Sequence, residues 1–383
     1  MKNKIALASL YLAAAGISTA EIVINEFLSF EGFVDMSYAH TDGGVYSNDS
    51  DEAGQHGDDS DNRYAIDQVE ISWLFGFDRV TAQLDLEYEE DDAGTSVDQA
   101  FVTYHLDHGG ALTAGRYDSM LGFEAFEPTG LYQVSRAYGF PQALAQDGDF
   151  DDMVVDGGGS VVFPLPGTNQ GVKYTYTTDQ TTFGVSVQDG VYHYADRLGG
   201  SDAGDDGGGY GLEVGCGYNL GNGWALFLGA AYEDGDSTAF AESAESYVVN
   251  GYVTFEAGAW LLAAELNYGE SELGRVAISP ETTQVAVSDL QTSTISGLLL
   301  ANYAYTQQAS VTGRFSFVDA DVDDYRDLDA YRAVQYTLAH NYAFTDNLRL
   351  VAEVSYIDGE GDDDRDDLEF DELLGAVELI FAF

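Results

Sequence analysis

The chain has 383 residues, of which 67 are acidic and 14 are basic, and its formal net charge is -53. A surface this acidic repels nucleic acid and attracts cations. The 45% hydrophobic and 13% aromatic content argues against a disordered polyanion. The single cysteine, Cys216, cannot form an internal disulfide, so a disulfide-stapled secreted domain is also disfavoured.

The N-terminus has the order of a secretory signal peptide. A basic "MKNK" is followed by the apolar "IALASLYLAAAGI" and by the small residues "STA", which end at Ala20. The apolar run is too short to span a membrane as a helix. We therefore expect residues 1–20 to be removed, so that the exported chain begins near Glu21 and forms one unit over 21–383.

A two-residue period dominates the rest of the chain and predicts β-strands. In "RVTAQLDLEYE", Val80, Leu84 and Tyr88 share one face, and Asp85 and Glu87 share the other. The segments "WLLAAELNYG" and "LRLVAEVSY" alternate in the same way. A soluble sandwich would show this pattern too. After residue 20, no segment approaches the roughly 20 apolar residues of a spanning helix.

The connections between these segments come in two sizes that alternate along the chain. Transmembrane barrels have short periplasmic turns, longer outer loops and an even number of strands. We therefore predict an all-β fold, a transmembrane antiparallel β-barrel of sixteen strands. The hairpin "MVVDGGGSVVF" would raise the number to eighteen if it entered the wall. The short turns lie near 77–79, 107–110, 178–181, 220–223, 257–259, 307–308 and 345–347, and the long loops cover 41–61, 89–95, 118–170, 193–208, 233–245, 270–292, 319–329 and 359–368.

Aromatic residues mark the ends of the apolar faces, as in the girdles of membrane barrels. Trp73, Tyr88 and Trp224 are examples. The chain ends in "ELIFAF", which places Phe381 and Phe383 on one face of the last strand. In lipid every backbone polar group needs a partner, so the first strand must pair with the last.

The segment "LTAGRYDSMLGFEAFEPTGLYQ" places a Gly-Arg pair at the end of a strand, directly before the longest loop. With this feature, the signal peptide, the strand rhythm and the terminal Phe383, the chain resembles Gram-negative outer-membrane porins. The stretch from Gly115 to Gln133 resembles a β-barrel porin family known mainly from genome sequences. This resemblance implies the cell outer membrane as location, a homotrimer, and a third loop, 118–170, folded into the lumen. It also implies that Phe381 and Phe383 form the assembly signal read by the barrel-insertion machinery.

The resemblance also suggests which residues form the constriction. Arg116 matches the position of the family's wall arginine, and Glu124 and Glu127 lie where loop acids face it. The alternatives are a structural salt bridge for Arg116 and a solvated loop surface for the two glutamates. Further loop candidates are Asp147, Asp149, Asp151 and Asp152.

Alternation places both bases and acids on the lumen wall, and the acids outnumber the bases. We therefore expect a preference for cations. The basic candidates are Lys173, Arg314 and Arg349, and the acidic ones are Asp35, Asp85, Glu87, Glu213, Glu256, Glu265, Glu353 and Glu378.

No cofactor or strong metal site is predicted. The Asp-rich outer loops suit weak binding of Ca²⁺ or Mg²⁺, but none matches a complete calcium loop. His105 and His108 flank a turn without a third ligand, so a zinc site is not expected. The chain has no G-x-S-x-G, P-loop or zincin motif, and we predict that it is not an enzyme.

The sequence thus predicts a porin for passive diffusion of small hydrophilic solutes and cations, with outer-membrane lipid around it. One alternative is a substrate-specific channel, which an aromatic track or a paired basic ladder along the lumen would favour. Another is a non-conducting barrel that anchors the acidic outer layer, which a lumen plugged by residues 118–170 would favour.

Overall fold

The computed structural model describes residues 21–47, 55–89, 94–138, 154–155, 159–160, 165–191, 210–235, 244–278, 285–323, 329–362 and 367–383. The predicted signal peptide, residues 1–20, lies outside this part of the chain, as do the four late-loop candidates Asp147, Asp149, Asp151 and Asp152.

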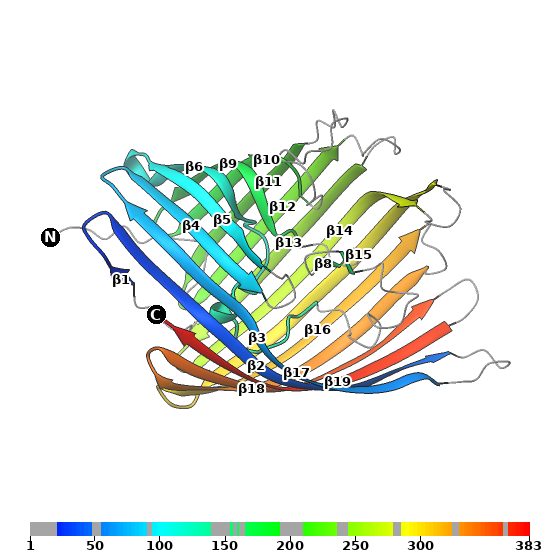
Figure 1. Ribbon diagram of the computed structural model, residues 1–383. Coiled ribbons are helices and arrows are strands. Elements are labelled where there is room, and N and C mark those ends of the chain that lie inside the picture. The colour runs from blue at the N-terminus through cyan, green and yellow to red at the C-terminus, as the bar shows by residue number, and fades with distance from the viewer. Residues whose placement is uncertain are drawn as a thin grey trace.

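Sixteen antiparallel strands form a closed barrel (Figure 1). Each strand pairs with the next along the chain, and β19 pairs with β2 to close the wall. A short β1 (Ile22–Val23) adds to β2 outside this ring. The strands are β2 Leu28–Ser47, β3 Gln55–Gly76, β4 Val80–Glu89, β5 Gly94–His105, β6 Gly110–Asp118, β9 Thr168–Thr177, β10 Thr181–Gln188, β11 Tyr210–Gly221, β12 Trp224–Gly235, β13 Ala244–Ala257, β14 Trp260–Ile278, β15 Val285–Ala304, β16 Ala309–Asp323, β17 Ala330–Thr345, β18 Leu348–Asp362 and β19 Asp367–Ala382.

The hairpin that could have raised the strand number does not join the wall. Its strands β7 (Val154–Val155) and β8 (Gly159–Ser160) pair only with each other, in a sheet of their own. The prediction of sixteen strands is therefore confirmed. The described helices are two short 3₁₀ turns, η1 (Asp107–Gly109) and η2 (Pro128–Gly130), and neither is long enough to cross a membrane.

All seven predicted short turns join strands at one end of the barrel, where both termini also lie (Figure 1). Several predicted long loops are shorter than expected. For example, β14 continues to Ile278 and β15 begins at Val285, inside the predicted loop 270–292. The apolar alternation ends earlier than the backbone pairing, which continues beyond it.

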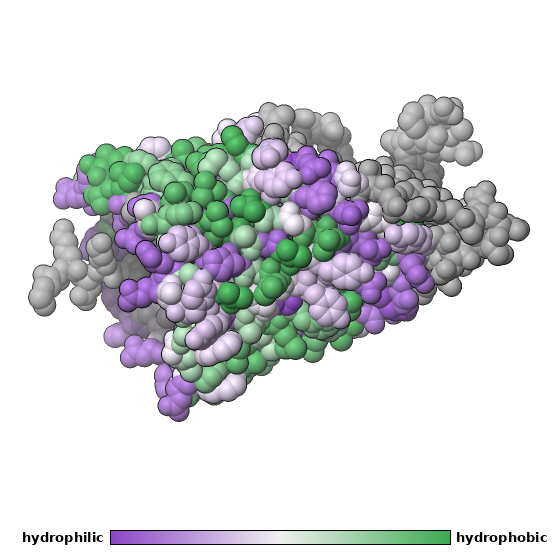
Figure 2. Space-filling model, turned by 90° about the horizontal axis from the view of Figure 1, so that it is seen from below, coloured by the Kyte–Doolittle hydropathy of each residue, from purple (hydrophilic) through white to green (hydrophobic). Residues whose placement is uncertain are grey.

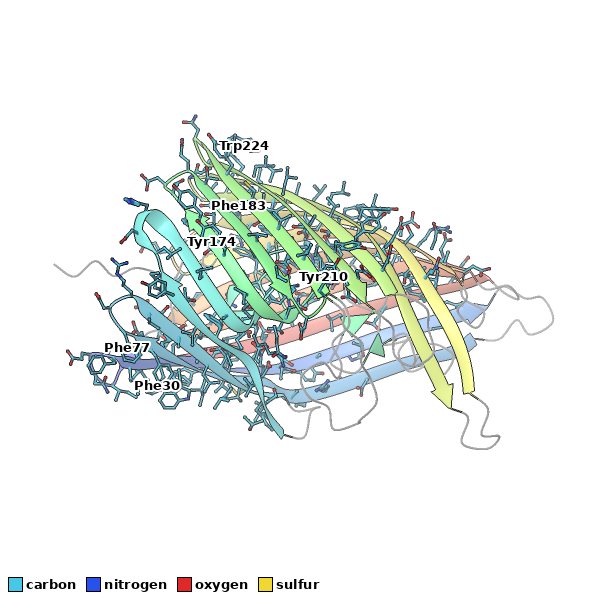
Figure 3. All side chains as sticks on the ribbon, turned by 90° about the horizontal axis from the view of Figure 1, so that it is seen from above. Phe30, Phe77, Tyr174, Phe183, Tyr210 and Trp224 are labelled. Carbon is cyan, nitrogen blue, oxygen red and sulfur yellow. The ribbon has the colours of Figure 1, made fainter. Side chains whose placement is uncertain are left out.

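The outward face carries the apolar side chains, which spread over the surface seen in Figure 2. Aromatic pairs strengthen it near the short turns, with ring centroids 4.6 Å apart for Trp224–Phe255 and 4.5 Å apart for Trp260–Tyr303. In Figure 3, Trp224 lies toward the turn end of the wall and Tyr210 toward the other end. This is the placement expected of two interfacial girdles.

Candidate functional site: the lumenal loop and the wall that holds it

A glycine lies within β6, three residues before the strand ends at Asp118 and the lumenal loop begins. Gly115 has φ +135°, and a Cβ at this position would lie 2.1 Å from the backbone oxygen of Ala100 on β5. Only glycine tolerates both the backbone angle and the close approach. This requirement explains the glycine of the Gly-Arg pair, and the chain then turns into the lumen at Ser119.

Apolar side chains of the loop pack against the inner wall. Leu121 is buried against Phe227 and Val248, and Ala137 is buried against Leu298 and Leu300. These contacts remove apolar surface from the water of the lumen, which stabilises the folded-in position of the loop. The packing follows β12 to β15, on one side of the barrel.

Three glutamates that were predicted to line the lumen accept hydrogen bonds from the loop. Each is buried, and each comes from a different strand, β11, β14 or β18. Charge-assisted bonds of this kind satisfy both the carboxylate and the backbone N–H groups of a segment without regular structure. Glu213 accepts from Met120 N at 2.5 Å and Ser119 Oγ at 2.9 Å, Glu265 from Phe123 N at 2.7 Å and Tyr138 Oη at 2.8 Å, and Glu353 from Val134 N at 2.6 Å and Ser135 N at 3.1 Å.

Arg314 on β16 also holds the loop, but it donates hydrogen bonds where the three glutamates accept them. Its guanidinium donates to the backbone oxygens of Ser135 at 2.7 Å and Arg136 at 3.0 Å, and to Glu124 Oε1 at 2.7 Å. Glu124 also accepts from Ala137 N at 2.7 Å. Glu124 is therefore an ion-paired anchor inside the loop and is not a solvated surface residue.

Arg349 on β18 makes a second anchor of the same kind. It donates to the backbone oxygens of Pro128 at 2.7 Å and Leu131 at 3.2 Å. These carbonyls belong to or follow the η2 turn, in which Pro128 O also accepts from Leu131 N at 3.2 Å. The buried charges of both arginines are thus compensated by loop dipoles, in Arg314 also by Glu124 and in Arg349 also by the charges of Glu378 and Asp35.

The other loop acid, Glu127, has a different environment. It accepts from Gln68 Nε2 at 2.8 Å, and its carboxylate oxygens lie within 4.8 Å of those of Glu70 and Asp98. Burial raises the pKa of Glu127 well above its ordinary value, and the charges of Glu70 and Asp98 raise it further. Glu127 faces other acids of the wall, whereas Glu124 faces an arginine.

The predicted basic residues lie on two sides of the barrel. Arg116 is half-buried on β6, where its charge acts on Asp98 and Asp118. The Lys173 ammonium on β9 lies 4.1 Å from the ring centre of Tyr117. In the ring of sixteen strands, β6 and β16 are eight strands apart, on opposite sides. Arg116 and Arg314 therefore lie on opposite sides of the lumen, and Glu124, which the resemblance placed opposite Arg116, pairs with Arg314.

Of the remaining wall candidates, Asp35 and Glu378 are buried, and Glu256 is exposed beside a short turn. Asp85 is fully buried, and Glu87 is half-buried and accepts from Gln68 Nε2 at 2.5 Å. Sequence reasoning missed Glu70 and Asp98. Glu70 could have been found by extending the alternation of β3, but Asp98 lies at a β-bulge that the sequence does not reveal.

The C-terminal residues lie against β2, the first strand of the barrel wall. Phe383 exchanges two backbone hydrogen bonds with Gly32, of 2.8 and 2.9 Å, and its ring lies 6.2 Å from that of Phe30. Phe381 points outward.

A closed sixteen-stranded barrel with an apolar belt and a loop held in its lumen defines the class of outer-membrane channels. The chain belongs to the family described as "Putative beta-barrel porin-2, OmpL-like", whose model matches residues 161–383. It is a porin of the Gram-negative outer membrane, a channel protein. No curated protein matches it.

Solved structures share the fold at low sequence identity. The outer-membrane channel DcaP of Acinetobacter baumannii is 12% identical over 93% of this chain and 97% of its own, with a TM-score of 0.58. The anion-selective porin from Comamonas acidovorans is 14% identical over 93% and 99%, with a TM-score of 0.57. The outer-membrane-expressed OmpT of Vibrio cholerae is 12% identical over 95% and 100%, with a TM-score of 0.55.

Proposed function

We propose that this porin is a cation-preferring channel for passive diffusion of small hydrophilic solutes. One observation carries the proposal. On the side of Arg314 and Arg349 the positive charges are bound to loop oxygens, whereas around Glu127 the wall presents carboxylates. Glu70 Oε2 and Asp85 Oδ1 have no hydrogen-bond partner among the described residues. A lumen with this charge distribution attracts cations.

The structural relatives support the fold but do not decide the selectivity. The Comamonas acidovorans porin is anion-selective according to its description, although it shares the barrel. Selectivity must therefore come from the lumenal side chains of each chain. In this chain those side chains are mostly acidic.

The test is the reversal potential of the purified protein in a planar bilayer under a KCl gradient. We expect conductance steps, and a reversal potential whose sign shows that K⁺ permeates more readily than Cl⁻. Glu127→Gln should reduce the cation preference. Asp179→Asn removes the same charge from the exposed turn between β9 and β10 and should leave the preference unchanged. Anion selectivity of the wild type would refute the charge argument, and an absence of conductance steps would refute the channel.

A non-conducting barrel is the second candidate, and one observation favours it. The loop is bonded to β11, β14, β16 and β18, so it crosses a large part of the lumen. The same bilayer measurement distinguishes the two, because a plugged barrel gives no conductance steps. A substrate-specific channel would instead show saturable block of the current by its solute.

We further propose a homotrimer, since a trimer form of OmpT from Vibrio cholerae is among the proteins with this fold. Chemical crosslinking of the purified protein in detergent should give a band at three times the monomer mass. A band at the monomer mass alone would contradict the trimer. Export would leave an N-terminus near Glu21, which Edman sequencing of the mature protein can check.

A further inference from the structure

Three carboxylates, from two strands and the loop, meet at one place on the lumen wall, and a fourth lies on the strand between those two strands. Glu70 on β3, Asp98 on β5 and Glu127 on the loop offer oxygens that all lie within 4.8 Å of one another. Asp85 on β4 lies between the strands that carry Glu70 and Asp98. These four residues are called the acidic pocket below.

The backbone is irregular where it supplies one of these ligands. Val97 and Val102 are both exposed on the outer face, although they are five residues apart and strict alternation would put them on opposite faces. The register of β5 against β4 shifts between Leu84 and Leu86, so Asp98 and Gln99 together oppose Asp85. A bulge of this kind re-aims a side chain, and here it directs Asp98 to the lumen side.

Two oxygens of the acidic pocket have no partner. Asp85 is fully buried, and its Oδ1 has no hydrogen-bond partner among the described residues, although Oδ2 accepts from Gln83 at 2.8 Å. Glu70 is 6% exposed, and its Oε2 is likewise without a partner, although Oε1 accepts from Ser72 at 2.9 Å. A buried carboxylate oxygen without a donor is costly, so each of these atoms needs a proton, a water molecule or an ion.

The local basic groups do not balance these acids. The charge of Arg116 acts on Asp98. Among the described residues, the donors to Glu70, Asp85 and Glu127 in these hydrogen bonds are neutral side chains. Either protons or a metal ion must then neutralise the acidic pocket. Burial raises the pKa of Glu127, and repulsion by the neighbouring carboxylates raises it further.

We propose that the acidic pocket binds one hard divalent cation of the calcium class, which ties the loop at Glu127 to β3 and β5. Calcium takes six to eight oxygen ligands at about 2.3–2.6 Å, so oxygens on opposite sides of the ion are roughly 4.6–5.2 Å apart. The carboxylates of Glu70, Asp98 and Glu127 have separations of this order or less. The site needs no conduction, so it can be tested separately from the proposed channel.

The experiment is calorimetric titration of the full mature protein, folded in detergent and freed of metal by EDTA, with CaCl₂. We expect one site that is tighter than the weak binding by the acidic outer loops. Since affinity depends on the number of charged ligands, Glu127→Gln should weaken that site at least about tenfold. Glu70→Gln provides a second variant if the first fails to fold.

Asp179→Asn is the control, because it removes one negative charge from an exposed turn and leaves the acidic pocket intact. Loss of the tight site in both glutamate variants and its retention in the control would establish the proposal. Identical titrations for all four proteins would place any calcium on the outer loops and would overturn it. A wild type with no tight site would overturn it as well, whether or not the protein conducts.

Discussion

Arg314 on the wall and Glu124 on the loop form a buried ion pair, with Nη1 and Oε1 2.7 Å apart and the arginine side chain fully buried. The two residues are 190 positions apart in the chain. The same guanidinium also donates to loop carbonyl oxygens, so one wall residue binds both a carboxylate and the backbone of the loop. This pair joins β16 to the segment that leaves β6 on the opposite side of the barrel.

Replacing Arg314 should destabilise the protein strongly. In Arg314→Gln, Glu124 would keep a buried charge without its cation, and removal of one partner of a buried pair costs about 3–5 kcal/mol. The free energy of unfolding in urea, followed by tryptophan fluorescence in detergent, measures the loss.

Arg332→Gln is the matched control. Arg332 pairs with Asp319 and Glu360 where its side chain is 42% exposed, and loss of such a pair costs at most about 1 kcal/mol. Equal losses in the two variants would show that the Arg314 pair is not a buried anchor.

The wall carboxylates should control the local opening of the loop. In Glu353→Gln the neutral amide has one acceptor oxygen for the amides of Val134 and Ser135, and a charge-assisted bond is worth about 1.5–3 kcal/mol. Hydrogen exchange of a peptide that covers residues 131–138 should become at least about tenfold faster, which corresponds to about 1.4 kcal/mol. Glu256→Gln, at an exposed position beside a short turn, should leave this exchange unchanged. Unchanged exchange in Glu353→Gln would mean that the loop is held by packing alone.

Much of this arrangement is predictable from the sequence, because a strand has an exact period of two. Alternation correctly places Asp85, Glu265 and Glu353 on the lumen side, and the alternating turn lengths correctly predict sixteen strands. The pairing of Glu124 with Arg314 could not be predicted in this way. It depends on which strands face each other across the lumen, and that follows only from closure of the ring.

Local irregularities are the second part that the sequence does not reveal. The bulge at Asp98 shifts the alternation by one residue, and nothing in the composition of β5 marks it. The Gly-Arg pair was interpreted as the carrier of the wall arginine. In the structure, the glycine allows β6 to approach the backbone of β5 closely, and the charge of Arg116 acts on neighbouring acids.

Glu127 should make the free energy of unfolding depend on pH. Its pKa in the folded protein is raised above the ordinary 4.5, so the folded state holds its proton more tightly than the unfolded state. Its contribution to stability is therefore fully present below pH 4.5 and is lost as the pH rises through the raised pKa. In EDTA at pH 8, Glu127→Gln should be more stable than the wild type by at least about 1.4 kcal/mol, the value of one pKa unit. This difference should shrink as the pH is lowered toward 4.5, as urea unfolding at a series of pH values would show. A difference that is constant with pH would mean that Glu127 does not titrate in this range.

Gly115 should be the least replaceable glycine at the start of the loop. In Gly115→Ala the new methyl group would meet Ala100 O at 2.1 Å and Phe101 Cα at 2.7 Å, both parts of β5 that cannot rotate away. The positive φ adds roughly 1–3 kcal/mol of backbone strain.

Gly375→Ala on β19 is the control, because a Cβ there meets no heavy atom within 4 Å. We expect the control to fold within about 0.5 kcal/mol of the wild type, and Gly115→Ala to lose more than about 3 kcal/mol or to fail to fold, since the clash adds to the strain. The fraction that keeps heat-modifiable mobility in gel electrophoresis measures folding. Wild-type folding of Gly115→Ala would show that β5 and β6 can separate enough at this point to admit a Cβ.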